Sequence, residues 1–335
     1  MNQKFDFQHD QVHWGVIGAG DVCEVKSAPA MNKIPSSKLV AIMRRNAEKA
    51  KDYAIRHQVP KWYNSADKLI NDPDVNAIYI ATPPDTHRYY TLRAAESGKP
   101  VYVEKPMART WEECRDMVQT CKKAGVPLYV AYYRRTLPNF LKIKSLIESG
   151  EIGEVRTVHI QMCKTPLQEI VSGSHDNWRV IPEIAGGGLF YDLASHQLDF
   201  LDYMFGRIIR AGGSSTNHGG YYSAEDLVTG YFEFENGVLG TGNWCFTTSE
   251  TSETDNTVII GSKGQITYET FGEPVIQLET DENGVKSFTF EMPENIQYYL
   301  IETIVNELLG KGHCPSTGDS AARTNWVLSQ ICGSI

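Results

Sequence analysis

Three features that whole classes of protein require are missing from this sequence. No run of its 335 residues approaches the ~20 consecutive apolar residues of a membrane span. The first 13 residues are polar and contain no apolar core of a signal peptide. Basic residues are outnumbered, 32 against 41 acidic ones, and the net charge of −9 argues against nucleic acid or an anionic membrane as a main partner. We therefore expect a cytoplasmic protein.

Cysteine is present, but in no pattern that binds zinc or builds a disulfide framework. The seven cysteines are an odd number with scattered spacing, and no two of them form a CxxC pair. We expect reduced thiols and no metal site. Cys114 and Cys121 lie seven residues apart on one expected helix, where a place in the core explains them better than metal binding.

What the sequence does contain is an alternation of strand-like and helix-like segments in its first part, which is typical of a parallel sheet with helices on both faces. We expect strands at Val12–Ile17, Leu39–Met43, Ala77–Ala81, Val101–Val103 and Pro127–Tyr132. Between them we expect helices at Asp21–Lys33, Asn46–Gln58, Ala66–Asn71, Arg88–Ser97 and Trp111–Ala124. The length indicates two domains, 1–134 and 135–335, with a C-terminal helix that packs back on the first.

The pattern changes after about Gly150 and becomes rich in strands joined by short turns. We expect strands at Val155–Lys164, Leu227–Glu235, Gly240–Thr248, Thr257–Ile260 and Ile266–Glu269. The expected helices are Ile184–Phe205, Gln297–Leu309 and Ala321–Cys332. A sheet of hairpins with few helices leaves one face open, and such a face is suited to pairing with a second subunit.

A glycine-rich turn between the first strand and the first helix is typical of a dinucleotide site. Gly18 permits the tight turn, and Gly20 lets the backbone approach a pyrophosphate at a helix N-terminus. The expected contacts are Gly18, Ala19, Gly20, Asp21 and Val22. The third glycine of the full motif is replaced by Cys23, which is small enough to pack against the strand.

The second strand ends in Arg44-Arg45, where an NAD-preferring site usually has an acid for the ribose hydroxyls. Guanidinium groups match the geometry of a 2′-phosphate, which a carboxylate would repel. We therefore predict NADP(H) as the preferred cofactor, with NAD(H) possible. The plainer alternative is a solvated turn, because two arginines before a helix are common.

A lysine at the end of a buried strand marks the expected active site. Glu104-Lys105-Pro106 follows the apolar run 101–103. Proline ends the strand, so Lys105 lies at the carboxyl edge, where ligands bind in open α/β sheets. Thr82 and Pro83 follow the preceding strand and are expected to line the cofactor groove, and Glu104 and Lys105 are expected to contact the cofactor as well. His87, one turn later, is included in the cofactor site, although a role in ordering the loop is the simpler explanation.

Asp192 and His196 follow three glycines and are spaced i, i+4, so a helix places them on one face. A carboxylate beside an imidazole can hold its orientation and raise its basicity. A surface pair is the alternative. Asp199 and Asp202 continue the helix and are expected to be solvated or capping, although Asp199 could instead support a residue that contacts the substrate. The polar loop 172–179 precedes them, and we expect Asn177, Trp178 and Arg179 to contact substrate, although Trp178 alone would more often be core.

In this order, Gly18-Ala19-Gly20, Thr82-Pro83, Glu104-Lys105-Pro106 and the Asp192/His196 pair resemble the glucose–fructose oxidoreductase / inositol dehydrogenase / rhizopine-catabolism (Gfo/Idh/MocA) family. The resemblance implies an N-terminal Rossmann domain, a doubly wound parallel sheet. It also implies a C-terminal α/β domain with a large open, mostly antiparallel sheet that forms a homodimer or homotetramer.

The resemblance also implies site roles. The histidine at 196 exchanges a proton with the substrate oxygen, the lysine at 105 polarises that oxygen, and the aspartate at 192 fixes a substrate hydroxyl or the histidine. Our prediction is an NADP(H)-dependent oxidoreductase that transfers a hydride between nicotinamide and a carbinol or carbonyl carbon of a sugar or cyclic polyol. The alternatives are a glycoside-cleaving enzyme that oxidises its substrate transiently and a nucleotide-sensing regulator without chemistry.

Overall fold

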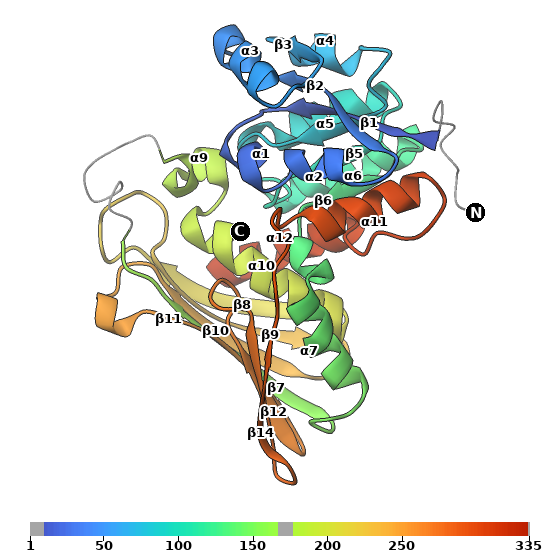
Figure 1. Cartoon of the computed structure of the whole chain (residues 1–335). Coiled ribbons are helices and arrows are strands. Elements are labelled where there is room, and N and C mark those ends of the chain that lie inside the picture. Colours follow the sequence, from blue (N-terminus) through green and yellow to red (C-terminus); the bar gives the residue numbers. More distant parts are fainter. Residues whose placement is uncertain (1–9, 167–176, 334–335) are drawn as a thin grey trace. The chain divides into compact units, whose positions relative to one another are not determined.

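The computed structural model describes residues 10–166 and 177–333 (Figure 1). The chain divides into two compact units. The first contains Met1–Ala108, Glu112–Tyr133 and Pro293–Ala322, and the second contains Arg109–Trp111, Arg134–Met292 and Arg323–Ile335. The chain thus leaves the first unit and returns to it. The division into domains 1–134 and 135–335 stays a prediction.

The first unit contains a six-stranded parallel sheet in the order β3-β2-β1-β4-β5-β6. Its strands are β1 (Val12–Ile17), β2 (Ser37–Met43), β3 (Lys61–Tyr63), β4 (Ala77–Ile80), β5 (Val101–Val103) and β6 (Leu128–Val130). Its helices are α1 (Asp21–Val25), α2 (Ala28–Lys33), α3 (Ala47–Arg56), α4 (Ala66–Ile70), α5 (His87–Glu96), α6 (Trp111–Ala124) and α11 (Tyr298–Leu308). This confirms the doubly wound Rossmann sheet expected from the sequence.

One expected helix of this unit is broken. The sequence predicted a single helix over 21–33, whereas the structure has α1 and α2 with a break at Lys26 and Ser27. Pro29 lies in the first turn of α2, and proline has no N–H to continue the hydrogen-bond ladder of α1. The Ser27 hydroxyl donates to the Val22 carbonyl at 3.2 Å, which satisfies an acceptor at the end of α1.

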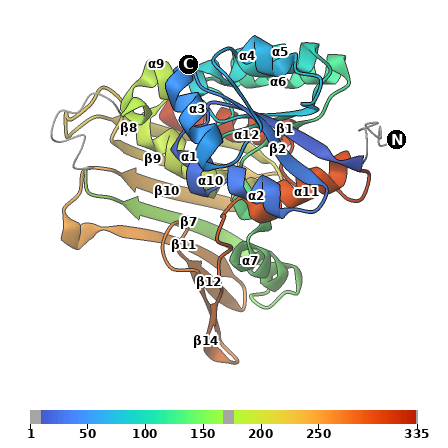
Figure 2. The same cartoon turned by 45° about the horizontal axis from the view of Figure 1, so that its top comes forward.

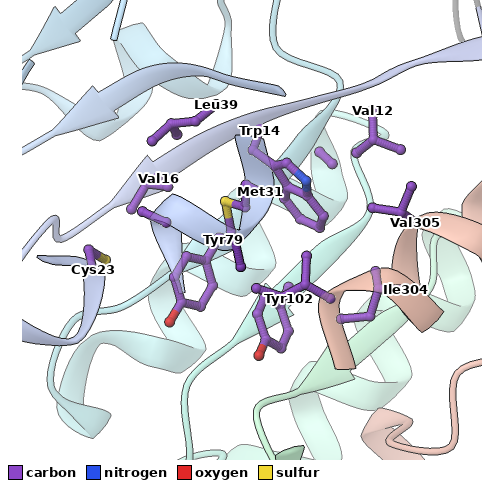
Figure 3. Close-up of a cluster of buried hydrophobic side chains, with 14 of the residues drawn as sticks. Val12, Trp14, Val16, Cys23, Met31, Leu39, Tyr79, Tyr102, Ile304 and Val305 are labelled. Carbon is purple, nitrogen blue, oxygen red and sulfur yellow. The ribbon is translucent and has the colours of Figure 1, made fainter. Parts of the chain in front are cut away.

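The core of the first unit combines both ends of the chain (Figure 3). Trp14 of β1 meets Tyr102 of β5 edge to face at 6.3 Å between centroids, and Tyr102 stacks on Tyr79 of β4 at 4.7 Å. Ile304 and Val305 of α11 are buried in the same cluster. Helix α11, about 200 residues after these strands in the sequence, therefore completes this core.

The second unit contains an eight-stranded sheet in the order β14-β13-β12-β11-β7-β10-β9-β8 (Figure 2). Its strands are β7 (Val155–Cys163), β8 (Ile208–Thr216), β9 (Leu227–Phe234), β10 (Leu239–Cys245), β11 (Thr254–Gly261), β12 (Gly264–Tyr268), β13 (Val275–Thr280) and β14 (Gly284–Thr289). Every pairing is antiparallel except that of β7 with β10. The expected large, mostly antiparallel sheet is confirmed.

Helices cover one face of this sheet (Figure 1). They are α7 (Pro138–Glu148) and α10 (Gly188–Phe205), together with α12 (Gly318–Cys332), which begins in the first unit, while the short helix α9 (Pro182–Ala185) packs on α10. Phe140 of α7 packs edge to face on Phe200 of α10 at 4.7 Å and on Tyr268 of β12 at 5.8 Å. On the alternate face, Tyr231 and Leu239 are half exposed. In the described residues, no helix is long and apolar enough to cross a membrane.

Candidate functional site

The loops after four strands of the first sheet lie at one edge of it. β1, β2, β4 and β5 end at Ile17, Met43, Ile80 and Val103. Because their pairings are parallel, these carboxyl ends share an edge. β1 lies between β2 and β4, where the order of strands reverses. Open α/β sheets bind ligands at this point.

The turn after β1 fits a dinucleotide. Gly18 has φ +90°, and the N–H groups of Gly18 and Ala19 donate to the Met43 carbonyl at 2.9 and 3.3 Å. A Cβ on Gly18 would lie 2.5 Å from Thr82 Cγ2, whereas one on Gly20 would meet nothing nearer than 3.8 Å. There is no room for a side chain at Gly18, whereas the space beside Gly20 is open. A pyrophosphate can therefore approach the backbone at Gly20.

Asp21 and Val22 begin α1, and Cys23 stands where the full motif has its third glycine. Cys23 is fully buried, and its carbonyl accepts a hydrogen bond from the Tyr53 hydroxyl at 2.7 Å. Burial raises the pKa of the Cys23 thiol to about 12. A thiol that stays protonated is a packing group and not a nucleophile.

Arg44 and Arg45 come directly after Met43, whose carbonyl holds the glycine turn. The backbone N–H of Arg44 donates to the Tyr63 carbonyl of β3 at 3.1 Å, which fixes the backbone where the side chains depart. Arg45 is exposed and Arg44 is half-buried. Two cations therefore stand beside the turn, at the place where NAD sites commonly have an acid.

The loop after β4 contains internal hydrogen bonds, and a buried histidine contacts its backbone. The Thr86 hydroxyl donates to Thr82 Oγ1 at 2.7 Å and also lies 3.0 Å from the Pro83 carbonyl. His87, the first residue of α5, is fully buried, and its Nε2 lies 2.7 Å from the Thr82 carbonyl. Burial lowers the pKa of His87. Its side chain thus contacts the loop backbone from the protein interior.

Glu104 is the centre of a buried polar network next to Lys105. Its Oε1 accepts from the Tyr79 hydroxyl and from Gln297 Nε2, each at 2.6 Å, and its Oε2 lies 3.2 Å from the Lys105 N–H. The Tyr102 hydroxyl donates to Gln297 Oε1 at 2.7 Å. The Lys105–Pro106 peptide is cis. This network restrains the backbone that carries Lys105, and it positions Glu104 as a support of the site.

Sequence reasoning missed three members of that network. Tyr79 and Tyr102 look like ordinary members of apolar strands, and Gln297 lies just before a helix nearly 200 residues away. A polar tip on a buried aromatic residue usually needs a partner, which is the one signal available for the tyrosines. No local pattern identifies Gln297.

In the second unit, helix α10 carries Asp192 and His196, as expected. Arg179 Nε lies 3.5 Å from Asp192 Oδ2, and the Arg179 guanidinium lies 4.6 Å from the centroid of the Trp178 ring. Asn177 Oδ1 accepts from the Arg179 N–H at 3.2 Å. The structure therefore places Arg179 beside Asp192, and Asn177 and Trp178 each contact Arg179. The rest of the polar loop, 167–176, lies outside the described residues.

An aromatic side chain that the sequence did not indicate lies beside His196. The Phe271 ring meets the imidazole edge to face at 5.6 Å, and the Arg134 guanidinium stacks over Phe271 at 4.2 Å. The Phe271 N–H donates to Asp255 Oδ2 at 2.6 Å. One face of the histidine is therefore bounded by an aromatic wall with its own hydrogen-bonded anchor.

The expectation that Asp199 is solvated or capping is wrong. It is buried one turn after His196 and forms a two-armed ion pair with buried Arg135, at 2.8 Å from Nε and 2.5 Å from Nη2. Thr324 also donates to it at 3.2 Å. Burial raises the pKa of Asp199 to about 6 despite the pairing with Arg135. Because Arg135 lies outside α10, periodicity alone could not reveal this pair.

Within the described ranges, no group of three or more His, Cys, Asp or Glu side chains could hold a metal ion.

Comparisons with known proteins agree with this geometry. A model of an oxidoreductase family with an NAD-binding Rossmann fold matches residues 12–132, and a GFO/IDH/MocA C-terminal domain model matches residues 140–267. Oxidoreductase P35 of Formosa agariphila is 40% identical over 96% of this chain and 99% of its own length. The 1,5-anhydro-D-fructose reductase of Ensifer adhaerens is 32% identical over 70% of this chain and 69% of its own.

Among solved structures, levoglucosan dehydrogenase in complex with NADH and levoglucosan superposes with a TM-score of 0.87. It is 21% identical and covers 96% of each chain, so this likeness concerns the fold. The chain belongs to the Gfo/Idh/MocA family and is an NAD(P)-dependent oxidoreductase.

Proposed function

We propose that this enzyme prefers NADP(H) and transfers a hydride between nicotinamide and a carbinol or carbonyl carbon of a sugar or cyclic polyol. The observation that carries the cofactor preference is the pair Arg44-Arg45, which follows the residue whose carbonyl holds the glycine turn. A guanidinium pair there attracts a ribose 2′-phosphate, and the segment 44–46 between β2 and α3 contains no acid.

The substrate class rests on relatives and on the chemistry near Asp192. One relative is named 1,5-anhydro-D-fructose reductase, and another, from Bos taurus, is named trans-1,2-dihydrobenzene-1,2-diol dehydrogenase. The Bos taurus protein is 30% identical over 76% of this chain. Asn177, Arg179 and Asp192 offer donors and acceptors for hydroxyl groups, and Trp178 offers a flat apolar surface of the kind on which a ring can lie.

Three side chains carry the proposed chemistry. His196 accepts the proton of the substrate hydroxyl during oxidation and returns it during reduction. The Lys105 ammonium group stabilises negative charge on the same oxygen. Asp192 orients a substrate hydroxyl or the imidazole. When bound, the nicotinamide supplies or accepts the hydride, and the loops at Gly18–Val22, Arg44-Arg45, Thr82-Pro83 and Glu104-Lys105 hold the cofactor.

Fluorescence titration with NADPH and with NADH tests the cofactor preference. We expect the wild-type protein to bind NADPH at least tenfold more tightly, which corresponds to ~1.4 kcal/mol. Arg44→Asp should remove or reverse this ratio, because the carboxylate repels a 2′-phosphate. Arg115→Asp, an equal change of charge on exposed α6, should leave the ratio unchanged.

The outcomes separate the remaining possibilities. Equal binding of both cofactors in the wild type would contradict the arginine argument and direct the substrate screen to polyol oxidation with NAD⁺. A preparation that already contains bound cofactor and gives no net NADP⁺ reduction would favour glycoside cleavage through transient oxidation.

A further inference from the structure

The ring of His87 has carbonyl oxygens at both of its nitrogens. Nε2 lies 2.7 Å from the Thr82 carbonyl, and Nδ1 lies 3.1 Å from the Pro106 carbonyl and 3.2 Å from that of Met107. The side chain has no exposed surface. Both ring nitrogens thus lie within hydrogen-bond distance of backbone carbonyls.

The carbonyls belong to two different loops of the first unit. Thr82 is in the loop after β4, which closes against Gly18 of the glycine turn. Pro106 and Met107 are in the loop after β5, directly after Lys105. One imidazole therefore bridges the loop that borders the cofactor turn and the loop that carries the reactive lysine.

Packing alone does not account for a histidine at this position. The next turn of α5 buries Thr91, and the following one buries Ala94 and Ala95, so an apolar side chain would also fill the space under the loops. A buried imidazole carries a desolvation cost that an apolar residue avoids. That cost is offset only if the ring's hydrogen bonds are used, and here they join the two loops.

The ring cannot hold both loops equally in its neutral form. A neutral imidazole has one N–H, so it donates to one loop while its other nitrogen faces acceptors. Burial lowers the pKa of His87, and the carbonyls and the Glu104 carboxylate oppose this. The neutral ring can therefore donate a hydrogen bond to only one of the two loops. A protonated ring has N–H groups at both nitrogens and can donate to both loops.

We propose that His87 is a positioning residue that couples the cofactor loop at Thr82 to the Lys105 loop. The inference rests on the proposed function, which assigns the Thr82 loop to cofactor binding and Lys105 to the chemistry. Its test uses two readouts that need no substrate. The NADPH dissociation constant from fluorescence titration reports on the Thr82 side, and the pH-dependent acylation rate of Lys105, followed by peptide mass spectrometry, reports on the lysine side.

Three substitutions distinguish the contact of His87 with the Thr82 loop from its contact with the Lys105 loop. His87→Phe keeps the bulk and removes both ring nitrogens, and with them every hydrogen bond of the ring. His87→Asn places an amide donor near the position of Nδ1 and keeps the Lys105 side, whereas His87→Gln places one near Nε2 and keeps the Thr82 side. The control is Thr91→Val, because the Thr91 hydroxyl is buried on the same helix and has no hydrogen-bond partner among the residues that the structure describes.

We expect His87→Phe to weaken NADPH binding by about tenfold and to change the Lys105 acylation rate severalfold, as loss of buried hydrogen bonds predicts. His87→Gln should restore the NADPH affinity but not the acylation rate, and His87→Asn should do the reverse. Thr91→Val should match the wild type in both readouts.

Two results would overturn the proposal. One is a His87→Phe protein that matches Thr91→Val in both readouts. The other is an equal loss in both readouts for the Asn and Gln variants, which would indicate a purely structural role. Because neither readout involves turnover, a catalytically normal Lys105→Ala enzyme would contradict the proposed function and leave this test intact.

Discussion

The two units build their candidate site residues in different ways. In the first, four parallel strands deliver their loops to one edge, and hydrogen bonds from backbone or buried side chains fix each loop, as at Met43 and Glu104. In the second, Asp192 and His196 lie on a helix over an antiparallel sheet, and side chains such as Arg179 and Phe271 surround them. Backbone geometry specifies the first set, and side-chain packing specifies the second.

This difference has consequences for variation. A site held by backbone and by buried polar groups tolerates few changes, because the turn at Gly18 has no room for a side chain. A site surrounded by side chains can be altered by single substitutions at 177–179 without changing the fold. We therefore expect cofactor recognition to be the more constrained property and substrate choice the more adjustable one.

The largest expected effects come from removing one chemical group in each unit. His196→Ala should lower turnover by ~10²–10⁴-fold, the usual range for loss of a general acid–base group. Lys105→Ala should lower it by ~10²–10³-fold, the usual range for loss of a group that stabilises charge on the reacting oxygen. NADPH affinity should change little. Steady-state kinetics on the substrate found by screening, together with the fluorescence titration, checks both statements.

Matched controls are available for each of these variants. Lys123→Ala on exposed α6 and His159→Ala on the exposed face of β7 should keep wild-type turnover. Wild-type turnover in Lys105→Ala or His196→Ala would contradict the proposal that each unit supplies one group that takes part in the chemistry.

The buried ion pair of the second unit gives the next largest effect. Arg135→Met leaves Asp199 buried without its main cation and should reduce the free energy of unfolding by about 3–5 kcal/mol near neutral pH. Urea unfolding followed by circular dichroism measures this. Arg156→Met, which removes an exposed pair with Glu154, should cost less than ~1 kcal/mol.

The same variant has a predictable pH dependence. The folded pKa of Asp199, about 6, lies above its ordinary value of 3.8. The folded state therefore binds more protons between these values, and this contribution to stability falls as pH rises through the window. Arg135 lowers the pKa of Asp199, so removing it raises that pKa further and extends the pH window upward. A protonated Asp199 needs no cation, so Arg135→Met should be less destabilising at pH 5 than at pH 7.5. An equal loss at both pH values would show that Asp199 does not take up the proton.

The smallest effect is expected at a surface cluster of the first unit. Arg56 donates to Glu24 at 2.8 and 2.9 Å, His57 lies 2.6 Å from it, and these contacts lower the pKa of Glu24 to about 2. Its contribution to stability is present above the ordinary pKa of 4.5 and is lost as pH falls toward 2.

Because these side chains are partly exposed, Glu24→Gln should cost only ~0.2–1 kcal/mol at pH 7 and less in high salt. A double-mutant cycle with Arg56→Gln in urea unfolding isolates the pair. A coupling that persists unchanged in 1 M salt would contradict this surface-electrostatic account.

Much of the fold could be predicted because its signals are local. The parallel strands of the first unit are apolar runs bounded by turn residues, and Asn46 caps α3 by accepting from the Lys49 N–H at 3.0 Å. The misses have physical reasons. β3 has only three residues, with Trp62 exposed, and β8 and β14 are largely exposed, so neither apolar burial nor alternation marks them. β13 was also missed, although its residues alternate between buried and more exposed positions.

The candidate site divides along the same line. The glycine turn, the arginine pair and Lys105 could be found because each lies in one short segment beside a recognisable strand. Gln297, Phe271 and Arg135 could not, because each acquires its role from residues more than 60 positions away. Their spacing in the sequence carries no periodic signal.

The return of α11 to the first unit has a consequence for synthesis of the chain. The buried residues Leu300, Ile301 and Ile304 emerge from the ribosome only after the entire eight-stranded sheet has been made. Until then, the cluster around Trp14 lacks one wall and Glu104 lacks the amide of Gln297. The nucleotide-binding unit, although it is encoded first, is therefore completed late, and a nascent chain stalled before residue 297 exposes apolar surface that a chaperone can recognise.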